Sequence, residues 1–270
     1  MTIHGDTRRL DIVGSGLRIP THLSPESLSV LGEASRVLTT LSVFDVLSFP
    51  TEIRVKCEPL DNLFQPDIPR LETYQQMANL IVDAVMSQEG SVAFLTRGNP
   101  RVLNTITELL VRASDTFEYD CRVFPAISSF DSILIDVGYD PMAGVQLVEA
   151  SAAVHDDVRL NPHLACLVYQ PYALGSRLPS GASSKGPPAL EKLQEYLCSL
   201  WAPSHTLAVV ISHAEADGSA AITWTKVGAL VDVGADQLAG GTLFIPPAHR
   251  PEVIDHRFDA LVPSPKTGPE

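Results

Sequence analysis

Short apolar runs alternate along this chain with longer stretches whose apolar residues recur every three or four positions. The short runs are rich in valine, isoleucine and leucine and end in turn residues, so they predict strands at residues 9–13, 36–41, 91–96 and 121–124. The helical spacing predicts helices at residues 25–34, 71–86, 102–114 and 130–137. Strands and helices that alternate in this way predict an α/β fold with a parallel sheet.

Residues 42–68 interrupt the alternation. Pro50, Pro59 and Pro66 lie inside this stretch and Pro69 follows it. Proline has no backbone N–H and clashes with the preceding helical turn, so a long helix is excluded here. We therefore expect irregular structure before the helix at residues 71–86.

The second half of the chain begins near residue 126. Apolar runs predict strands at residues 145–149, 164–169, 206–212, 221–225 and 243–247, and a helix at residues 189–200. Residues 176–188 are rich in Gly, Ser and Pro, which indicates a mobile surface loop inside the second domain. We expect an N-terminal parallel α/β domain over residues 1–125, a C-terminal α/β domain over residues 126–250, and a disordered tail over residues 251–270.

Composition excludes several classes of protein. The 270 residues are 45% hydrophobic and 19% charged, which is enough apolar content for packed domains. The net charge of −13 has the wrong sign for binding phosphodiester backbones, so no nucleic-acid partner is expected. No apolar run reaches membrane-spanning length and the first residues lack a signal-peptide core, so we expect a cytoplasmic protein without a membrane partner.

Cysteine spacing argues against structural cross-links. The four cysteines are widely separated and form no C-x-x-C pair, so neither a disulfide framework nor a zinc site is expected. No other residues stand at metal-ligand spacing, and no metal is predicted. His213 follows an apolar strand, a position that fits the edge of a cleft, but the favoured interpretation is a solvated loop histidine.

Two glycine turns follow predicted strands. In Gly14-Ser15-Gly16 the third glycine of a dinucleotide-binding fingerprint would fall on Ile19, so a nicotinamide site is not favoured. Gly98-Asn99-Pro100 follows the strand at residues 91–96. By itself it is an ordinary β-turn, but ligands bind at the carboxyl ends of strands in open α/β sheets.

Arg70 and Tyr74 stand four residues apart at the start of the predicted helix. This spacing places a guanidinium and a phenol on one helical face. Taken alone, the pair is most simply an exposed stacking contact. Its position before the strand and turn at residues 91–100 makes it a candidate for chemistry.

Several segments together resemble a known family. They are Val13-Gly14-Ser15-Gly16, Gly98-Asn99-Pro100, Pro125-Ala-Ile-Ser-Ser129, Tyr169-Gln170 and Gly241-Thr242-Leu-Phe-Ile-Pro-Pro247. In this order and at this spacing they resemble the tetrapyrrole-methylase superfamily of S-adenosylmethionine (SAM) enzymes over about residues 10–248. The Ile-Pro-Pro ending and the Arg-x-x-x-Tyr helix resemble its borosin-type peptide backbone N-methyltransferases.

The resemblance implies a two-domain tetrapyrrole-methylase-like fold with SAM in the inter-domain cleft. It implies SAM contacts at Arg97, Gly98, Asn99, Pro100, Val102, Ser128, Ser129, Gln170, Gly241 and Thr242. Two positions depart from the family pattern, which has glycine where this chain has Arg101 and serine where it has Gly241. The carboxylate of SAM would suit the helix N-terminus that follows Ser128.

The resemblance also implies catalytic roles for Arg70 and Tyr74. An amide nitrogen is a poor nucleophile because its lone pair is delocalised into the carbonyl. A phenolate can take its proton and a guanidinium can hold the oxygen that becomes negative. The borosin pattern has a further tyrosine where this chain has Phe64. Either Tyr74 suffices, or Asp61 replaces part of the role, or the substrate is not a peptide amide.

The leading hypothesis is a SAM-dependent methyltransferase that α-N-methylates backbone amides of a separate ribosomal precursor peptide. Only 270 − 247 = 23 residues follow Pro247, so the peptide is expected in trans, and the resemblance implies a homodimer. The alternatives are C-methylation of a tetrapyrrole or another planar small molecule, and a non-catalytic SAM-binding partner. Sequence alone leaves these three open.

Overall fold

The computed structural model of the protein describes residues 8–87, 90–156, 158–178, 189–213 and 218–248. They form two compact units. The first contains residues 8–87, 90–138, 175–178, 211–213 and 218–221, and the second contains the remaining described residues. Each unit has a sheet and a core of its own.

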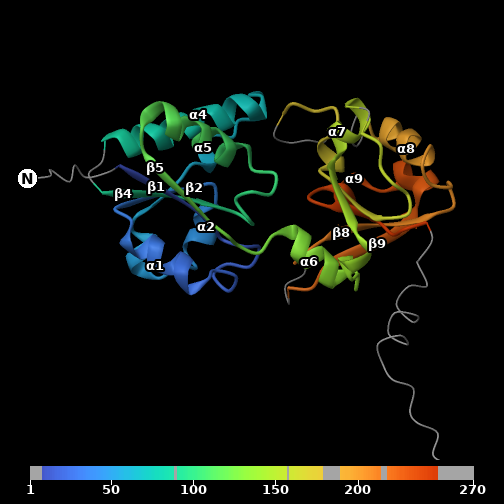
Figure 1. Ribbon diagram of the computed structural model, residues 1–270, viewed down its shortest axis with the longest axis horizontal. Coiled ribbons are helices and arrows are strands. Elements are labelled where there is room, and N and C mark those ends of the chain that lie inside the picture. Colours follow the sequence, from blue (N-terminus) through green and yellow to red (C-terminus); the bar gives the residue numbers. More distant parts are fainter. Residues whose placement is uncertain (1–7, 88–89, 157, 179–188, 214–217, 249–270) are drawn as a thin grey trace, which may run out of the picture. The chain divides into compact units, whose positions relative to one another are not determined.

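A parallel sheet lies at the centre of the first unit (Figure 1). Every pairing between its neighbouring strands is parallel, which confirms the prediction from the alternating pattern. The strand order in the described residues is β3 (Cys57–Pro59), β2 (Arg36–Thr39), β4 (Ser91–Thr96), β1 (Arg9–Gly14) and β5 (Asp120–Phe124).

Helices cover both faces of this sheet because its central strands are apolar on both sides. Leu10 and Ile12 of β1 pack against α4 (Arg70–Ser87) and α5 (Thr105–Phe117), which lie on one face. Val13 packs on the other face with α1 (Pro25–Glu33), near the short helices α2 (Val43–Val46) and α3 (Thr51–Arg54). Figure 1 shows α4 and α5 on one side of the sheet and α1 on the other.

Local capping explains where the helices begin. Ser24 accepts a hydrogen bond from the Ser27 N–H and starts α1, as the sequence predicts. The helix expected from residue 102 begins at Thr105 instead, because Asn104 accepts the Thr107 N–H and acts as its cap. α6 (Ser129–Asp136) begins after Ser128, which is also its cap.

Residues 42–68 are more regular than the sequence indicates. They contain α2, α3, the edge strand β3 and the 3₁₀ turn η1 (Asp61–Leu63). The prolines do exclude a long helix, but one-turn helices fit between them. β3 contains Pro59, which an edge strand tolerates because one of its sides makes no ladder bonds.

The second unit has a mixed sheet. In the described residues its order is β6 (Val145–Glu149), β7 (Ala165–Tyr169), β10 (Thr242–Ile245), β8 (Thr206–Ile211) and β9 (Ala221–Lys226). β6 and β7 are parallel, whereas β10 runs antiparallel to both β7 and β8. The remaining elements are α7 (Ala150–His155), α8 (Leu190–Cys198), α9 (Ala235–Leu238), η2 (Pro141–Ala143), η3 (Pro171–Ala173) and η4 (Val227–Asp232).

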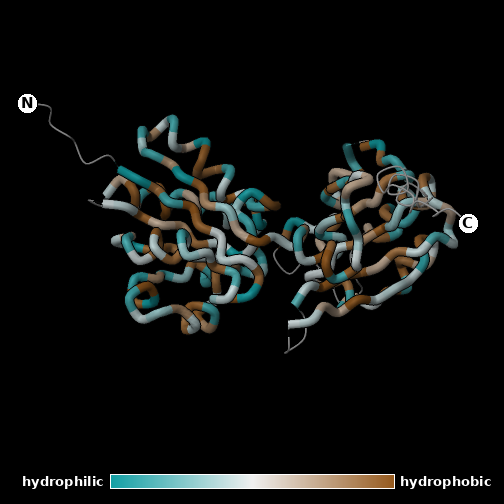
Figure 2. Tube along the Cα trace, turned by 60° about the horizontal axis from the view of Figure 1, so that its bottom comes forward, coloured by the Kyte–Doolittle hydropathy of each residue, from teal (hydrophilic) through white to brown (hydrophobic). Residues whose placement is uncertain are grey.

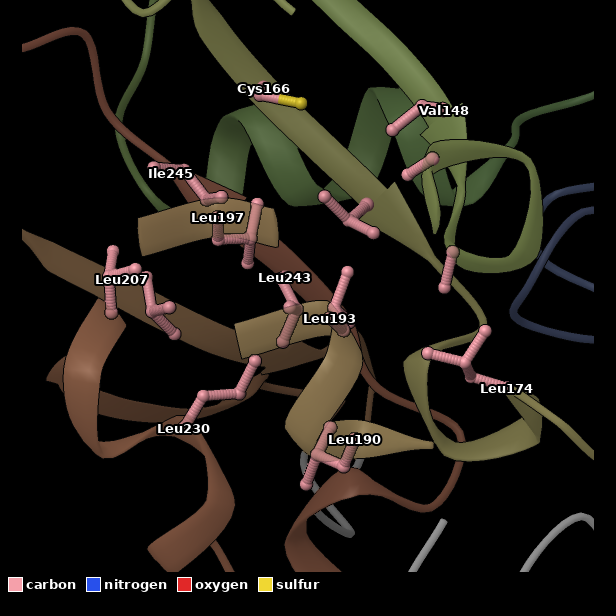
Figure 3. Packing of buried hydrophobic residues seen from close by; sticks show 14 of the residues in the cluster. Val148, Cys166, Leu174, Leu190, Leu193, Leu197, Leu207, Leu230, Leu243 and Ile245 are labelled. Atoms are coloured by element: carbon pink, nitrogen blue, oxygen red, sulfur yellow. The ribbon is translucent and has the colours of Figure 1, made fainter. Parts of the chain in front are cut away.

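One face of the mixed sheet packs against α8. Leu193 and Leu197 of α8 lie against Leu243 and other strand residues in a fully buried cluster (Figure 3). Figure 2 shows that hydrophobic and hydrophilic segments alternate along the trace in each unit. Each unit is therefore stabilised by its own buried apolar surface.

The division between the units falls after Gly138, later than the expected boundary at residues 125 and 126. Hydrogen bonds account for this difference. The Asn99 amide donates to the Ala126 carbonyl oxygen at 2.8 Å, and Ser212 Oγ donates to Asp136 Oδ2 at 2.6 Å. Both bonds link residues 126–136 to other parts of the first unit.

Two expectations fall partly or wholly on residues that the structure does not describe. The tail at residues 251–270 and residues 179–188 of the expected loop lie outside the described residues. Residues 176–178 are described, and they belong to the first unit, whereas the sequence placed them in the second. Within the described residues, no helix combines the length and the apolar character needed to cross a bilayer.

Candidate functional site

The turns after β1 and β4 meet at the carboxyl edge of the first sheet. Gly16 and Gly98 form an isolated bridge, in which the Gly98 N–H donates to Gly16 at 3.0 Å and the Gly16 N–H donates to Gly98 at 3.3 Å. A Cβ on Gly14 would lie 2.3 Å from the Gly98 carbonyl oxygen. Glycine is required at position 14 because the two turns approach so closely.

The Gly98-Asn99-Pro100 turn is held in shape by the Asn99 side chain. Its amide donates to Ala126 at 2.8 Å, and its Oδ1 accepts the Arg101 N–H at 2.9 Å. Gly98 has a φ of +71°, in the left-handed region, and a Cβ there would meet only Leu17, at 3.8 Å. Arg101 has no positive φ, so replacing the family's glycine at that position causes no backbone strain.

Arg97 is fixed by an ion pair. Its Nη2 lies 2.7 Å from Asp45 Oδ2, and Asp45 also caps α2 through Ser42. Partial burial works to raise the pKa of Asp45, but the hydrogen bonds from Ser42 and Arg97 outweigh burial and hold that pKa below its ordinary value. The carboxylate therefore stays charged near neutral pH and connects α2 to the residue before Gly98.

Ser128 is committed to the cap of α6. Its Oγ and its N–H both bond Asp131 Oδ2 at 2.7 Å, and its Oγ accepts the Asp131 N–H at 3.4 Å. This capping box brings a carboxylate to the first turn of α6. The expectation that the SAM carboxylate binds there thus meets an unfavourable charge, although the first N–H groups of α6, from Ser129 on, have no acceptor within the helix.

Arg70 and Tyr74 lie at the same edge of the sheet. α4 ends at Ser87 and β4 begins at Ser91, so the helix runs back along the sheet and its first turn lies toward the carboxyl edge. The Arg70 N–H donates to the Arg177 carbonyl oxygen at 2.8 Å, and its Nη2 donates to the Ser176 carbonyl oxygen at 3.0 Å. The guanidinium is therefore placed to bind a main-chain carbonyl.

Tyr74 is half-buried and packs on the core beneath α4. The ring of Phe64 meets the ring of Tyr74 edge-on, with a centroid distance of 6.1 Å and an interplanar angle of 86°. Asp61 lies in η1, which contacts α4. Phe64, which replaces the tyrosine of the family pattern, thus contacts the Tyr74 ring and restricts its orientation.

The expected SAM residues of the second unit occupy unusual positions. Gln170 has a φ of +56°, which is strained for a non-glycine residue and often marks a functional site. Thr242 is buried at the start of β10, on the face opposite the Leu243 core. A Cβ on Gly241 would lie 2.7 Å from Val209 Cγ1, so the serine of the family pattern does not fit beside this valine.

Two histidines that the sequence does not single out for this role support the first turn. His22 Nδ1 accepts the N–H groups of Leu17 and Arg18, both at 3.3 Å, and so holds the turn that follows Gly16. The His213 ring lies 5.2 Å from the His22 ring. Its Nδ1 bonds Gly218 at 2.7 Å and its Nε2 bonds Ser132 at 3.4 Å, so the interpretation of His213 as a solvated loop residue is wrong.

A short chain of polar side chains at the same edge also escaped sequence reasoning. The Asn104 amide donates to Thr96 Oγ1 at 2.8 Å, and Thr96 Oγ1 lies 3.3 Å from Thr40 Oγ1. Thr40 follows β2, Thr96 ends β4 and Asn104 precedes α5, and the position of polar residues near the ends of the predicted elements is the signal that could have found them. They tie β2, β4 and the cap of α5 together beside the Gly98 turn.

Comparisons with known proteins show the family to which the chain is similar. The family model described as "Tetrapyrrole (Corrin/Porphyrin) Methylases" matches residues 9–225. A "methyltransferase/ribosomally synthesized type II borosin cyclic peptide precursor" from Phlebiopsis gigantea is 30% identical over 179 residues, which are 63% of this chain and 31% of that protein. A type I borosin precursor of the same description from Cerrena unicolor is 26% identical over 173 residues, 63% of this chain and 42% of that protein.

The fold has counterparts among solved structures. The crystal structure of the methyltransferase CobJ superposes with a TM-score of 0.60 at 13% identity, covering 90% of this chain and 96% of that chain. Identity this low shows a shared fold and nothing finer. The matched region spans less than half the length of the two borosin precursors.

Proposed function

The chain belongs to the tetrapyrrole methylase family, whose members are SAM-dependent methyltransferases, and on this premise we propose that it methylates backbone amide nitrogens of a peptide. One observation supports this choice of substrate above others. Arg70 already donates to a main-chain carbonyl oxygen, and Tyr74 follows it by one helical turn. The names of the borosin relatives point to the same substrate class.

The expected cofactor residues suit a SAM ligand in their local geometry. In the first unit, a ligand can approach the backbone of the Gly98 turn, since a Cβ placed on Gly98 would have only Leu17 within 4 Å. In the second unit, the strained Gln170 and the buried Thr242 would offer hydrogen-bonding groups to the adenine. SAM, when bound, supplies an electrophilic methyl group.

The residues of α4 would prepare the acceptor nitrogen. Arg70 donates to the carbonyl oxygen of the acceptor amide and stabilises the negative charge that collects there. Tyr74, as phenolate, accepts the amide proton, and the nitrogen lone pair becomes available to form the new N–C bond. Phe64 has no hydroxyl, so the proposal assigns the proton transfer to Tyr74 alone.

The acceptor and the assembly are parts of the same proposal. We infer that the peptide is presented by a separate chain and that the protein works as a homodimer. The borosin relatives are named as methyltransferase and precursor together, so a peptide acceptor agrees with those names.

Co-expression with candidate precursor peptides tests the proposal. Mass spectrometry should show a gain of one CH₂ unit per modified residue, and fragmentation should place it on the backbone nitrogen. A Tyr74→Phe variant should lower kcat at least about 100-fold, because it removes the proton acceptor but keeps the ring. Candidate peptides that all stay unmodified after co-expression with the wild-type protein would contradict the proposal.

A second candidate function is C-methylation of a tetrapyrrole or similar planar molecule, which the family description favours. That reaction has no amide proton for Tyr74 to accept, so Tyr74→Phe should leave the turnover of the planar substrate unchanged. A non-catalytic SAM-binding role is separated by calorimetry. An enzyme should bind SAM and its demethylated product with different affinities, whereas a non-catalytic site should show little preference between them or no binding.

A further inference from the structure

The start of α4 holds two consecutive main-chain carbonyl groups from elsewhere in the chain. Arg177 accepts the Arg70 backbone N–H, and Ser176 accepts a guanidinium N–H of the same residue. Neither contact uses a side chain of the 175–178 segment. The start of α4 therefore binds this segment by its main chain, independently of the residues that it contains.

The position of Arg70 explains both contacts. Arg70 is the first residue of α4, so its N–H has no acceptor within the helix. The partial positive charge of a helix N-terminus adds to the charge of the guanidinium, and both attract carbonyl oxygens. Two donors on one residue thus match two successive acceptors on one chain.

The proposed reaction requires the same contact with a different chain. Arg70 must donate from its guanidinium to the carbonyl oxygen of the acceptor amide, and the Nη2 of that guanidinium now donates to the Ser176 carbonyl oxygen. We propose that residues 175–178 are an internal occupant of a main-chain-binding site at the start of α4, and that a peptide substrate reaches Arg70 by displacing them. The identity of the displacing chain rests on the proposed function, but the existence of the site does not.

Two features hold the segment in its bound shape. Gly175 has a φ of +77°, and Ser176 Oγ accepts the Leu178 N–H at 3.2 Å. An alanine at position 175 disfavours the positive φ, and an alanine at position 176 removes the hydroxyl. Both changes weaken the segment and leave α4 unaltered. Gly138 offers a matched control, since it has a φ of +63° in open space.

Chemical modification of Arg70 tests the site without a methyl acceptor. Phenylglyoxal reacts with accessible guanidinium groups, and mass spectrometry gives its rate at Arg70. Gly175→Ala should raise this rate about fivefold or more, given the cost of left-handed backbone in alanine, and Ser176→Ala should raise it less. Gly138→Ala should react like the wild type. Equal rates in Gly175→Ala and the wild type would overturn the inference.

Hexaglycine serves as a peptide probe because it offers main-chain groups without side chains. It should protect Arg70 from phenylglyoxal, and should do so at about fivefold lower concentration in Gly175→Ala than in the wild type. Absence of protection in every variant contradicts a main-chain site. This result would stand whatever reaction the enzyme catalyses.

Steady-state kinetics with a peptide that the enzyme methylates complete the test. Weakening an internal competitor should lower KM in Gly175→Ala by about fivefold and change kcat less than about twofold. A segment that only supports the fold would instead give a raised KM or a lowered kcat, which contradicts the proposal. If hexaglycine protects Arg70 but no peptide is methylated, the proposed function fails and the site stands. If peptides are methylated without such protection, only the site fails.

Discussion

Single residues at this site are constrained by close backbone approaches as much as by chemistry. Gly14 faces the Gly98 carbonyl oxygen and Gly241 faces Val209, each at a distance that a side chain would not permit. The sequence identifies Gly14 as part of a turn, but not the reason for it. The two departures from the family pattern also differ in origin. Packing against Val209 explains why position 241 is glycine, whereas the backbone at Arg101 accepts any residue.

Gly14→Ala should destabilise the protein by about 1–3 kcal/mol, since the new Cβ overpacks against backbone that cannot move independently. Gly32→Ala is the matched control. Gly32 lies in α1 with open space around it, so alanine there should stabilise by about 0.5–1 kcal/mol. Urea denaturation measures both. A Gly14→Ala variant with the wild-type free energy of unfolding would show that the two turns are not packed as described.

Gly241→Ser restores the family's residue and should nevertheless destabilise the second unit by about 1–3 kcal/mol, because its Cβ meets Val209 Cγ1. Adding Val209→Ala removes that contact. In the double variant the cost of the serine should therefore be smaller than in the wild-type background, which a double-mutant cycle measures. Strictly additive effects would refute the packing explanation.

At the scale of elements, short turns and caps position the candidate residues. The first turn of α4 presents Arg70 and Tyr74, the Asn99 side chain links the ends of β4 and β5, and His22 closes the turn after β1. The sequence predicts the long elements well, because their apolar periodicity is strong. It misplaces the start of α5 and overlooks β3, because caps and edge strands depend on contacts with other elements.

Stability should fall on acidification because of the turn that His22 closes. Burial first, then His213 and Arg18, lower the pKa of His22 from its ordinary value of 6.5. The unfolded chain therefore binds a proton more readily than the folded one. The contribution of neutral His22 to the free energy of unfolding is complete above pH 6.5, and it is lost as the pH falls from 6.5 through the pKa of His22 in the folded protein. His213 is the titratable group that faces His22, and Arg18 is the charged one.

A His22→Asn variant tests this attribution, since its side-chain oxygen can accept the same N–H groups but does not titrate. The slope of unfolding free energy against pH below 6.5 should be smaller in the variant than in the wild type. His155→Asn changes a histidine of the second unit and should keep the wild-type slope. An unchanged slope in His22→Asn would contradict the role of this residue.

At the scale of the molecule, two independent cores divide the candidate residues between them. Arg70, Tyr74 and the Gly98 turn belong to the first unit, and Gln170 and Thr242 belong to the second. The tetrapyrrole methylase model, which matches residues 9–225, covers parts of both units.

The proposed homodimer is a prediction at this scale. Light scattering after gel filtration should give a mass near twice 29.1 kDa. The mass should persist on dilution to low micromolar concentration, as expected for a stable assembly. A mass of one chain at all concentrations would exclude the dimer.

The sequence alone determined the class of fold, the family resemblance and the candidate pair Arg70 and Tyr74, because periodicity, glycine turns and helical spacing are local properties. Tertiary structure decided what those residues touch. The 175–178 segment at Arg70, the Phe64 ring against Tyr74 and the His22–His213 pair join residues from different elements. Contacts between distant segments depend on how each element packs on its neighbours, and no local pattern encodes that packing.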